Sequence, residues 1–482
     1  MALFSSPNTD FISQGSLILF MEVYLYLQGL YSVMAVTILF LIMGLGYRKT
    51  RCGSQACIIV LGDIGRSPRM QYHALSLATA NLDVEMVGYG GSKPHEDLLT
   101  NEKIKFHLMS IPPNIPNMIP SLFRYVFKVI WQTTQLLWVM LMKLRWPSHI
   151  LVQNPPAIPT LAVAWLCSRL YGSKFMIDWH NYGYTLLGLT LGEGHILVRF
   201  SRWFESVFGG WGDGHLCVTN AMKEDLMKRF GLKKPITLYD RPPKVFKETP
   251  LESQHELFSR LAEDYTVFTS STKSETSTAF TEKTASGEIL RKANRPALII
   301  SSTSWTPDED ISILLSALQK YDKACEEEAN LPAIVCAITG KGQEKKRYQA
   351  IIEQMTMKNV HICTPWLIAE DYPRLLGSSD LGVCLHASSS GLDLPMKVVD
   401  MFGSGLPVCA LKYDCIDELV KHRENGLVFS NADELATQLQ ELLRGFPEDQ
   451  QQLQKFKENL QQFQTERWEE NWEKTVRPTL YI

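Results

Sequence analysis

Short apolar runs alternate along most of the chain with longer segments in which apolar residues recur at helical spacing. Apolar runs bounded by glycine, proline or polar clusters predict buried strands, and the segments between them predict helices. This alternation is typical of a parallel sheet covered by helices on both faces, so the sequence predicts two successive α/β domains. The expected strands lie at 57–61, 83–88, 150–153, 175–178, 216–219 and 236–239 in the first domain, and at 297–301, 334–339, 360–363, 381–385, 407–410 and 426–429 in the second.

A polar segment, residues 247–295, separates the two sets of strands and is rich in Ser, Thr, Glu and Lys. We interpret it as a mobile, partly disordered insertion beside the interdomain linker, with a short helix at 251–261. The first α/β domain is then expected at 52–246 and the second at 296–446. Residues 447–482 are expected to form helices that return toward the first domain.

The stretch 23–46 has no charged side chain, and about 24 helical residues at about 1.5 Å each cross the ~30 Å apolar core of a bilayer. A cleaved signal peptide fits less well, because the preceding region carries Asp10 and Glu22 but no Lys or Arg. The cationic stretch 47–51 follows and favours the cytosolic side. The sequence therefore predicts a single-pass anchor with residues 1–22 in the lumen and the bulk of the chain in the cytosol.

A second segment, residues 119–146, bears on membranes because its aromatic and aliphatic residues are interrupted by single cations. That composition suits a membrane surface. The alternative is a long buried helix of the first domain, and both interpretations stand at this point. A second full span is disfavoured by Arg124 and Lys128.

Composition adds little beyond these boundaries. With 482 residues, 45% hydrophobic and 21% charged, the chain is long enough for two ordinary folded domains. The net charge of −3 provides no overall basic field, so we do not expect a nucleic-acid partner. The ten cysteines lack C-x-x-C pairs and a compatible histidine spacing, which indicates buried thiols in a reducing compartment rather than disulfides or a zinc site.

Lys397 and Asp400 are the first candidates for chemistry, because residues at i and i+3 share one face of a helix. A helix that begins near Lys397 also offers backbone N–H groups to a phosphate. Asp400 could accept the hydroxyl groups of a ribose, and the helix is expected to stop at Gly403 or Gly405. This pattern favours a nucleotide sugar, whereas the alternative is an exposed ion pair of little energetic weight.

Two loops of the second domain are also candidates for phosphate binding. Gly340 and Gly342 follow an apolar run, so the backbone between them could approach a phosphate closely while Lys341 adds a positive charge. A tight surface turn is the alternative. Ser302 and Ser304 end the first expected strand of the same domain.

Three long strings, residues 61–75, 178–184 and 389–403, closely resemble the chitobiosyldiphosphodolichol beta-mannosyltransferase family. The resemblance also includes 301–306 and 339–342, and it extends from about residue 57 to the C-terminus. It implies a GT-B glycosyltransferase with two Rossmann-like domains facing a cleft, the first binding the lipid-linked acceptor and the second the nucleotide sugar.

The family resemblance also implies a reaction and a location. Such an enzyme transfers mannose from GDP-mannose to the chitobiose of dolichyl diphosphate, forming a beta-1,4 bond with inversion. This is the first mannosylation in assembly of the lipid-linked precursor for protein N-glycosylation, on the cytosolic face of the endoplasmic reticulum membrane. The alternatives are a non-catalytic, membrane-anchored scaffold subunit and a mannosyltransferase acting on a later lipid-linked intermediate. A complex with other enzymes of the dolichol pathway, or with a second copy, would be compatible with either.

The resemblance assigns the donor to the second domain. Asp400 occupies the place of a ribose-binding glutamate in related enzymes, and Lys397 that of a diphosphate-binding lysine. The other glutamate of the E-x7-E pattern is replaced by Leu392, which leaves the hexose contact open, with Asp393 beside it. The donor-binding candidates are Ser302, Ser304, Gly340, Lys341, Gly342, His386, Ser390, Gly391, Asp393, Lys397 and Asp400.

Inversion requires a base that removes a proton from the acceptor hydroxyl. His180 is our first choice, because it follows an expected strand and an imidazole titrates near neutrality. Asp63, in the loop after the first strand, is the alternative base. Asp178 could orient His180, but the two share a face only if the strand persists through both.

Candidate acceptor contacts lie in the first domain. Gly62 and Gly65 would let the first loop pass close to the acceptor, and Arg66 and Arg69 could bind its diphosphate. Asn181 and Tyr182, next to His180, complete the acceptor set. No D-x-D pattern stands at a strand end, so we predict no tightly bound cofactor or metal, although Mg²⁺ could stimulate the reaction.

Overall fold

The computed structural model describes residues 54–116, 118–270, 276–306 and 309–480. The predicted membrane helix at 23–46 lies outside these residues. Within the described ranges, no helix combines the length and the apolar character needed to cross a bilayer. The described residues form two compact units, one made of those up to Ile177 with Val207–Gly214, and the other of Asp178–Ser206 with those from His215 onward.

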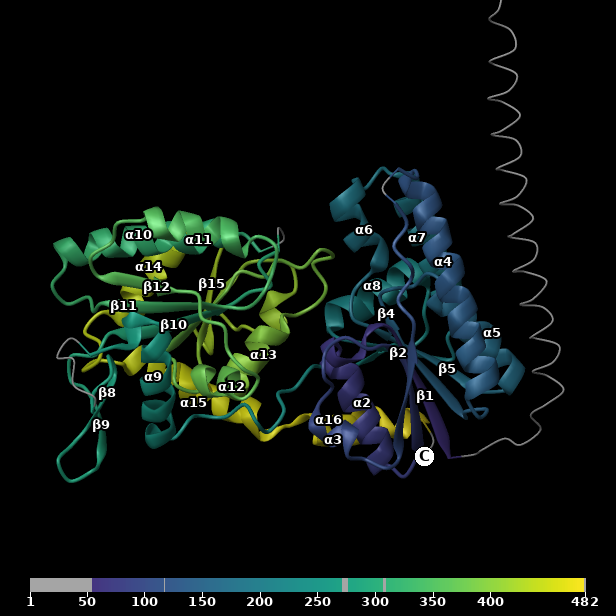
Figure 1. Cartoon of the computed structure of the whole chain (residues 1–482), viewed down its shortest axis with the longest axis horizontal. Coiled ribbons are helices and arrows are strands. Elements are labelled where there is room, and N and C mark those ends of the chain that lie inside the picture. The colour runs from purple at the N-terminus through teal and green to yellow at the C-terminus, as the bar shows by residue number, and fades with distance from the viewer. Residues whose placement is uncertain (1–53, 117, 271–275, 307–308, 481–482) are drawn as a thin grey trace, which may run out of the picture. The chain divides into compact units, whose positions relative to one another are not determined.

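A seven-stranded sheet has the order β3-β2-β1-β4-β5-β6-β7, and the pairs of β1 with β2 and β4, of β2 with β3 and of β6 with β7 are parallel (Figure 1). Its strands are β1 (Gln55–Asp63), β2 (Asp83–Tyr89), β3 (Ile104–Met109), β4 (His149–Asn154), β5 (Lys174–Trp179), β6 (Gly214–Cys217) and β7 (Ile236–Thr237). The associated helices are η1 (Ile64–Arg66), α2 (Pro68–Thr79), α3 (Glu96–Leu99), α4 (Ser121–Trp138), the π-helical turn η2 (Val139–Lys143), α5 (Thr160–Tyr171), α6 (Gly183–Leu191), α7 (Ile196–Gly209) and α8 (Asn220–Phe230).

A six-stranded, fully parallel sheet has the order β12-β11-β10-β13-β14-β15. Its strands are β10 (Ala297–Ser302), β11 (Ile334–Thr339), β12 (Val360–Cys363), β13 (Leu381–Cys384), β14 (Val408–Leu411) and β15 (Gly426–Phe429). The helices that follow these strands are α10 (Ile311–Glu327), α11 (Lys345–Gln354), α12 (Asp371–Leu376), α13 (Met396–Gly403), η4 (Ile416–Glu418), α14 (Ala432–Leu443), α15 (Gln451–Thr465), α16 (Trp468–Thr475) and α17 (Arg477–Leu480).

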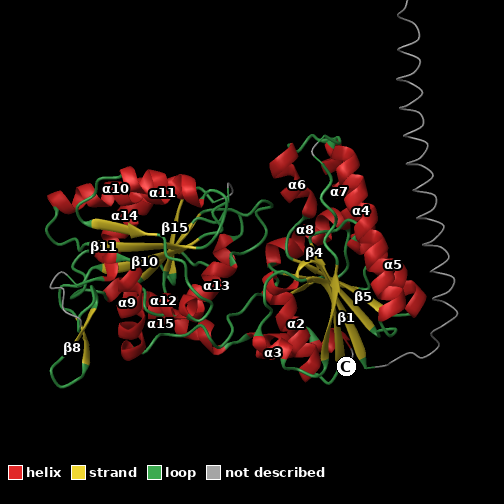
Figure 2. Ribbon diagram, in the orientation of Figure 1, coloured by secondary structure: helices red, strands yellow, loops and turns green. Residues whose placement is uncertain are grey.

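Helices cover both faces of each sheet, as Figure 2 shows, and this explains why the central strands read as continuous apolar runs. All six residues of β10 are buried. Ala297 and Ile299 pack into one core with α10 and α14, whereas Leu298 and Ile300 pack into the opposite core with α13. Alternate side chains of the strand therefore serve two apolar cores, because successive side chains point to opposite faces.

Strand order reverses between β1 and β4 in the first sheet and between β10 and β13 in the second. In doubly wound sheets, ligands bind outside the carboxyl ends of the strands at such a switch point. Asp63 ends β1 and Ser302 ends β10. The topology therefore directs attention to the loops that follow these strands.

The segment 247–295, predicted as a partly disordered insertion, is folded in much of its described part. It contains α9 (Leu251–Asp264), η3 (Thr266–Phe268) and an antiparallel hairpin of β8 (Thr281–Lys283) and β9 (Ile289–Arg291). Leu257, Phe258, Phe268 and Phe280 pack into the core on the α13 side of the six-stranded sheet. The prediction of partial disorder followed from the overall polarity of the segment. An amphipathic helix and a few phenylalanines are nevertheless enough to anchor it to the core.

Helix α4 and η2 occupy the segment 119–146, and neither sequence interpretation describes all of it. The first half is exposed, with Phe123 at 60% and Met118 just before the helix at 95%. The second half is buried, since Leu136 and Met140 have no exposed surface. The segment thus contributes to the core at one end and presents apolar side chains to the surroundings at the other.

Candidate functional site

Glu309 organises the loop after β10, and sequence analysis did not single it out. Its carboxylate is 3% exposed and accepts hydrogen bonds from the Thr303 hydroxyl (2.5 Å) and the Ser304 backbone N–H (2.7 Å). The next residue, Trp305, is fully buried and has a positive φ of 47°, a strained conformation for a non-glycine residue. Backbone strain of this kind is often retained where a loop must hold one shape for function.

Lys397, in the first turn of α13, forms an ion pair with the same Glu309 carboxylate. Its Nζ also lies 3.4 Å from the Ser304 hydroxyl. No side chain caps α13, whose first turn therefore keeps its backbone dipole open to an anion. The predicted phosphate-binding lysine is thus positioned by a carboxylate from the switch-point loop.

A second group of polar side chains follows β13. The carboxylate of Asp393 accepts a hydrogen bond from Ser388 and lies 3.4 Å from His386 Nε2. His386 Nδ1 is 4.0 Å from Glu309, so this group continues the Glu309–Lys397 pair. Gly391, whose φ is +73°, lies in the turn between Ser388 and Asp393. Asp393, rather than Leu392, therefore provides the carboxylate that faces the candidate donor residues.

Gly340 and Gly342 are required by backbone packing. A Cβ on Gly340 would lie 1.9 Å from the Thr303 carbonyl oxygen, and a Cβ on Gly342 would lie 1.9 Å from that of Ser304. The two glycines let the loop after β11 pack directly on the loop after β10. The predicted close approach is therefore made to protein backbone, and the loop still belongs to the same strand-end region.

Two lysines flank this glycine loop. Lys341 Nζ stands 3.9 Å from the centre of the Trp366 ring, an arrangement typical of a cation–π contact. Lys345, which sequence analysis did not select, donates to the Gly340 carbonyl (3.3 Å), and burial lowers the pKa of its ammonium group. Ser302, at the end of β10, accepts a hydrogen bond from Thr339 (3.4 Å).

Asp400 lies one turn after Lys397 on α13, as the spacing predicted. Burial and, after it, the charge of Asp240 raise the pKa of Asp400 well above the usual range of a carboxyl group. A carboxylate in such surroundings gains from any hydrogen-bond donor that reaches it, because the donor compensates the lost hydration. Ribose hydroxyls would be such donors.

Asp178 and His180 form a partly buried pair at the end of β5. The strand includes Asp178 and ends at Trp179, and the His180 Nε2 atom lies 2.8 Å from Asp178 Oδ2. Asp178 is fully buried and His180 is 22% exposed. A carboxylate on Nε2 favours the proton on that nitrogen, which leaves Nδ1 to accept a proton from a substrate. The structure thus contains the pairing of Asp178 with His180, which the sequence predicted only if the strand continued far enough.

Asp63 is arranged as a structural cap rather than as a free base. Its two oxygens accept hydrogen bonds from the backbone N–H groups of Gly65 (3.0 Å) and Ser92 (2.8 Å), and Arg66 lies 3.6 Å away. Partial burial alone would raise the pKa of Asp63, but the bonds from Ser92 and Gly65 and the charge of Arg66 together lower it. The engaged carboxylate oxygens and the lowered pKa both make Asp63 a poor proton acceptor.

The other acceptor candidates separate into exposed and buried groups. Arg66 is exposed. A Cβ on Gly62 would make only an ordinary contact with Val60 (3.9 Å), whereas a Cβ on Gly65 would lie 2.3 Å from the Ser92 carbonyl oxygen. Arg69 is only 3% exposed within α2, so its binding to the acceptor's diphosphate stays a prediction that this burial does not favour. The apolar spacing of α2 did not reveal this burial, because the charged side chain occupies an inward position.

The surroundings of Tyr182 and Asn181 give their predicted acceptor contacts little support. Tyr182 is 1% exposed and donates to Asp225 (2.7 Å), so it packs within the fold instead of facing a ligand. Burial, followed by Asp225, raises its pKa strongly. Within the second unit, Asn181 donates to Asp393 (2.9 Å), which links it to the candidate donor residues.

The described residues contain no cluster placed to bind a metal ion, and most of their cysteines are buried. In the ranges the structure describes, no group of three or more His, Cys, Asp or Glu side chains is placed to hold a metal ion. Nine cysteines are described, all as free thiols, and eight of them are buried. Burial raises the pKa of Cys384 to about 11 and that of Cys363 to about 12.

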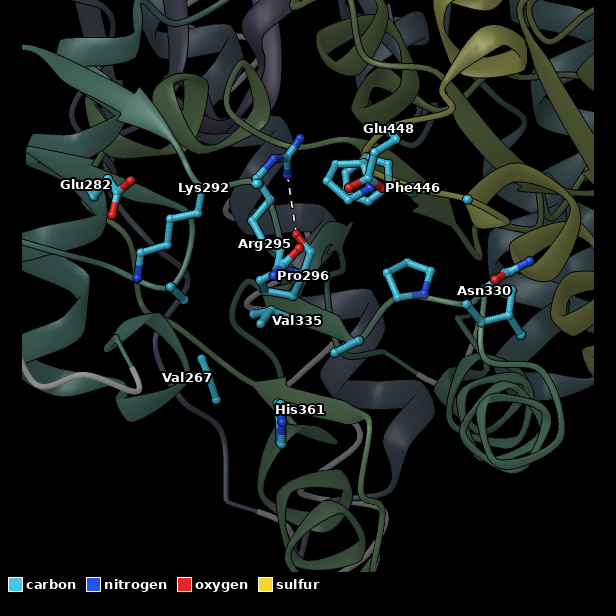
Figure 3. Close-up of a pocket in the computed structure, with 18 of the residues that line it drawn as sticks. Val267, Glu282, Lys292, Arg295, Pro296, Asn330, Val335, His361, Phe446 and Glu448 are labelled. Carbon is cyan, nitrogen blue, oxygen red and sulfur yellow. Dashed lines mark hydrogen bonds between the residues drawn. The ribbon is translucent and has the colours of Figure 1, made fainter.

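A separate cavity of about 960 Å³ lies near the amino ends of β10 and β11, away from the loops described above. Figure 3 shows Arg295 among its lining residues, donating to the Pro296 carbonyl (3.3 Å), and Arg295 is also paired with the buried Asp380 (2.7 Å). His361 on β12 is another lining residue. Because this cavity is at the opposite end of the strands, we do not assign it to the candidate donor site.

The chain shares its fold with solved glycosyltransferases. It has a TM-score of 0.61 to sucrose-phosphate synthase of Thermosynechococcus elongatus, at 11% identity over 87% of this chain and 96% of that one. For Anabaena HepE in complex with UDP the TM-score is 0.57, at 16% identity over 89% and 99% of the two chains. The family model "Glycosyl transferases group 1" matches residues 282–463. The two parallel sheets therefore define a GT-B glycosyltransferase, which confirms the predicted fold.

Curated relatives show which family of GT-B glycosyltransferases the chain belongs to. A human chitobiosyldiphosphodolichol beta-mannosyltransferase is 49% identical over 444 residues, 90% of this chain and 94% of the relative. The Dictyostelium discoideum protein of the same name is 39% identical over 88% of this chain and 93% of its own length. An Arabidopsis thaliana relative, 46% identical over 88% and 97%, is named UDP-glycosyltransferase TURAN. The chain belongs to the chitobiosyldiphosphodolichol beta-mannosyltransferase family, as its sequence strings predicted.

Proposed function

We propose that this enzyme transfers mannose from GDP-mannose to chitobiosyl diphosphodolichol, forming a beta-1,4 bond with inversion. The observation that carries the proposal is the 49% identity to relatives of that name over about 90% of the chain. The described side chains suit the reaction, because a histidine oriented by a buried carboxylate follows β5 and a positioned lysine stands at the start of α13.

In the proposed mechanism, Nδ1 of His180 accepts the proton of the acceptor's 4-hydroxyl as that oxygen attacks the anomeric carbon from the face opposite the nucleotide. Asp178 holds the imidazole and stabilises the positive charge that develops on it. The bond from the anomeric carbon to the diphosphate oxygen breaks, and the negative charge that appears there is stabilised by Lys397 and the amino end of α13.

In this scheme, Glu309 also holds Lys397 in position before the leaving group acquires charge. Without a nucleotide, the buried Glu309 carboxylate and Lys397 neutralise each other. A bound diphosphate would share Lys397 with Glu309, so the lysine needs little reorientation when the leaving group acquires charge. Fixed charges of this kind stabilise a transition state without reorganising during the reaction.

The proposal places the enzyme on the cytosolic face of the endoplasmic reticulum membrane. The exposed half of α4 supports contact with a membrane, since Leu122, Phe123 and Val126 are each about half exposed and Lys128 follows them. Protease treatment of sealed microsomes would test the cytosolic location, and protection of the bulk of the chain would contradict it. Co-purification at native abundance would test the expected complexes with other dolichol-pathway enzymes or a second copy.

The decisive experiment measures transfer by the full-length chain in detergent, with chitobiosyl diphosphate on a short isoprenoid as acceptor. GDP-mannose, UDP-glucose and UDP-N-acetylglucosamine are compared as donors, since the Arabidopsis relative's name refers to UDP. We expect a beta-mannosidase-sensitive product from GDP-mannose alone. Transfer from a UDP-sugar alone would overturn the proposed donor.

Two further arms address the alternatives. GDP-mannose binding without transfer to any acceptor would favour a scaffold subunit, and transfer only to an already mannosylated lipid would favour a later step of the pathway. The same assay with EDTA tests the expectation of no tightly bound metal. A loss of activity that added Mg²⁺ restores would identify a cation requirement.

A further inference from the structure

Helix α7 presents an apolar face to its surroundings. Ile196, Arg199, Phe200 and Trp203 follow one another at i, i+3, i+4 and i+7, and so lie on one side of the helix. Ile196 is 75% exposed, Phe200 49% and Trp203 55%. The rings of Phe200 and Trp203 contact each other, with centroids 5.6 Å apart. Large apolar groups gathered in this way mark an interaction surface.

Helix α6 adds leucines to the same region. Leu186, Leu189 and Leu191 are 42%, 63% and 39% exposed. The two helices are tied together by the fully buried Glu205 of α7, whose carboxylate accepts hydrogen bonds from the first backbone N–H groups of α6, including that of Gly183 (2.8 Å). Leu189 of α6 and Arg199 of α7 also line one cavity, so we treat the exposed residues of α6 and α7 together and call them the α6–α7 face.

Three arginines border this face. Arg199, Arg202 and Arg229 line a cavity of about 420 Å³ that also includes Tyr184. The guanidinium of Arg202 stands 5.8 Å from the Tyr184 ring centre, and Arg229 donates to the Tyr184 hydroxyl (2.8 Å). Arginine side chains so arranged can bind phosphate oxygens through paired N–H groups.

The carboxylates in the same region are engaged elsewhere or stand apart from Arg199. Asp225 is paired with Arg229 (3.0 Å), Glu205 accepts hydrogen bonds from backbone N–H groups of α6, and Glu193 is the one acid that lines the cavity. Among the described residues, Arg199 has neither an ion pair nor a hydrogen bond from its side chain. Two of the three arginines therefore remain available to an anion beside an apolar surface.

We propose that the α6–α7 face binds the lipid acceptor, with its diphosphate on Arg199 and Arg202 and its first isoprenoid units on Phe200, Trp203 and Leu189. The combination of a doubly charged head and an apolar chain matches the arginines and the exposed apolar side chains. Helix α6 begins three residues after His180, so the chain itself places this face next to the candidate base. The inference rests on the proposed function and deepens it.

Kinetics of an Arg199→Gln/Arg202→Gln variant test the diphosphate site. A hydrogen bond to a charged group contributes about 1.5–3 kcal/mol, so we expect the KM for the lipid acceptor to rise about 10- to 100-fold, with an unchanged KM for GDP-mannose. Arg347→Gln, on the exposed surface of α11, is the matched control and should behave as wild type. An unchanged acceptor KM in the double variant would overturn the proposal.

Acceptors with long and short lipid chains distinguish the role of the apolar side chains of the α6–α7 face from that of its arginines. Phe200→Ser/Trp203→Ser should raise the KM for a long isoprenoid acceptor and leave that for an acceptor with a minimal alkyl chain unchanged, whereas the arginine variant should lose affinity for both. If the arginine variant lost only binding to vesicles of anionic phospholipid, with acceptor kinetics in detergent unchanged, the face would bind bulk lipid and the proposal would fail.

Direct binding separates this inference from the proposed function. Quenching of tryptophan fluorescence by the chitobiosyl diphosphate lipid can be measured in the absence of any donor. Wild-type quenching that the arginine variant lacks would support the site even if no mannose were transferred. Product formation by wild type with equal lipid binding in both proteins would leave the function intact and remove the site. Should the double variant fail to fold, Arg199→Gln alone carries the same comparison.

Discussion

Two pairs of a carboxylate and a basic side chain stand at strand ends in this molecule, and they are built in opposite ways. Asp178 and His180 are two residues apart on one extended segment, with Nε2 2.8 Å from the carboxylate. Glu309 and Lys397 come from a loop and a helix that are 88 positions apart in the sequence. The first pair orients one ring, whereas the second connects the loop after β10 to α13.

The difference indicates what each pair does. A local pair can fix the tautomer and angle of a single imidazole, which is what a proton acceptor needs. A long-range pair fixes the distance between two elements, which is what a diphosphate bound by both would need. Mutations at the two pairs should therefore affect different kinetic constants, and the following experiments separate them.

His180→Ala should have the largest effect. Removing a general base lowers kcat by about 10²- to 10⁴-fold, while the KM for GDP-mannose should change little because the donor residues are untouched. Asp178→Asn should give a smaller loss in kcat. His361→Ala, in the remote cavity on β12, is the control. A His180→Ala enzyme with wild-type kcat would return attention to Asp63.

Glu309→Gln should act on the donor instead. Both hydrogen bonds from the β10 loop fall on the same oxygen of Glu309, so a glutamine oxygen can still accept them. The charge that holds Lys397 is lost, so we expect the KM for GDP-mannose to rise about 10-fold. The KM for the acceptor should stay the same. Glu326→Gln, at an exposed ion pair with Lys358, controls for a general loss of charge. Equal changes in both KM values would show that Glu309 has only a structural role.

Gly342→Ala should destabilise the fold. The new Cβ would lie 1.9 Å from the Ser304 carbonyl oxygen, and overpacking of this kind costs about 1–3 kcal/mol. Urea denaturation would measure the loss. Gly194→Ala, where no atom lies within 4 Å of the new Cβ, should differ from wild type by no more than about 0.5 kcal/mol. Identical midpoints for the two variants would show that the glycine loop can shift.

Asp400→Asn should have the smallest effect. It should stabilise the fold, whereas Gly342→Ala should destabilise it. Folding raises the pKa of Asp400, so ionisation of this carboxyl opposes folding once the pH exceeds the ordinary carboxyl pKa of about 3.9. The ligand-free variant should be more stable than wild type by about 1 kcal/mol at pH 7.5, and the gain should disappear below pH 4. A gain that is independent of pH would point to packing instead.

The sequence predicted most features that depend on neighbouring residues. The apolar runs predicted every strand of the six-stranded sheet and all of the seven-stranded sheet except β3, whose apolar residues are interrupted by Lys105 and His107. Lys397 with Asp400 follows from helical spacing. The pairing of Asp178 with His180 needed only a strand that continues far enough. Family strings added the reaction class, which spacing alone could not provide.

What the sequence did not predict depends on distant contacts or on the direction of a side chain. Glu309 is one acid in a polar loop, and nothing local distinguishes it from its neighbours. Arg69 and Tyr182 have ligand-like chemistry, yet both point into the core. The α6–α7 face was missed because burial of the opposite side of α7 has to be known before an exposed tryptophan becomes informative.

The buried thiols have a practical consequence. A cysteine is alkylated as its thiolate, and burial raises the pKa of Cys384 and Cys363 as well as hiding them from reagent. Labelling of the buried thiols in the folded enzyme should therefore be slow, and each modified one would record an opening of the structure around it. Mass spectrometry of Cys167 on α5 and Cys409 on β14 would then report opening around the two sheets separately, without any introduced probe.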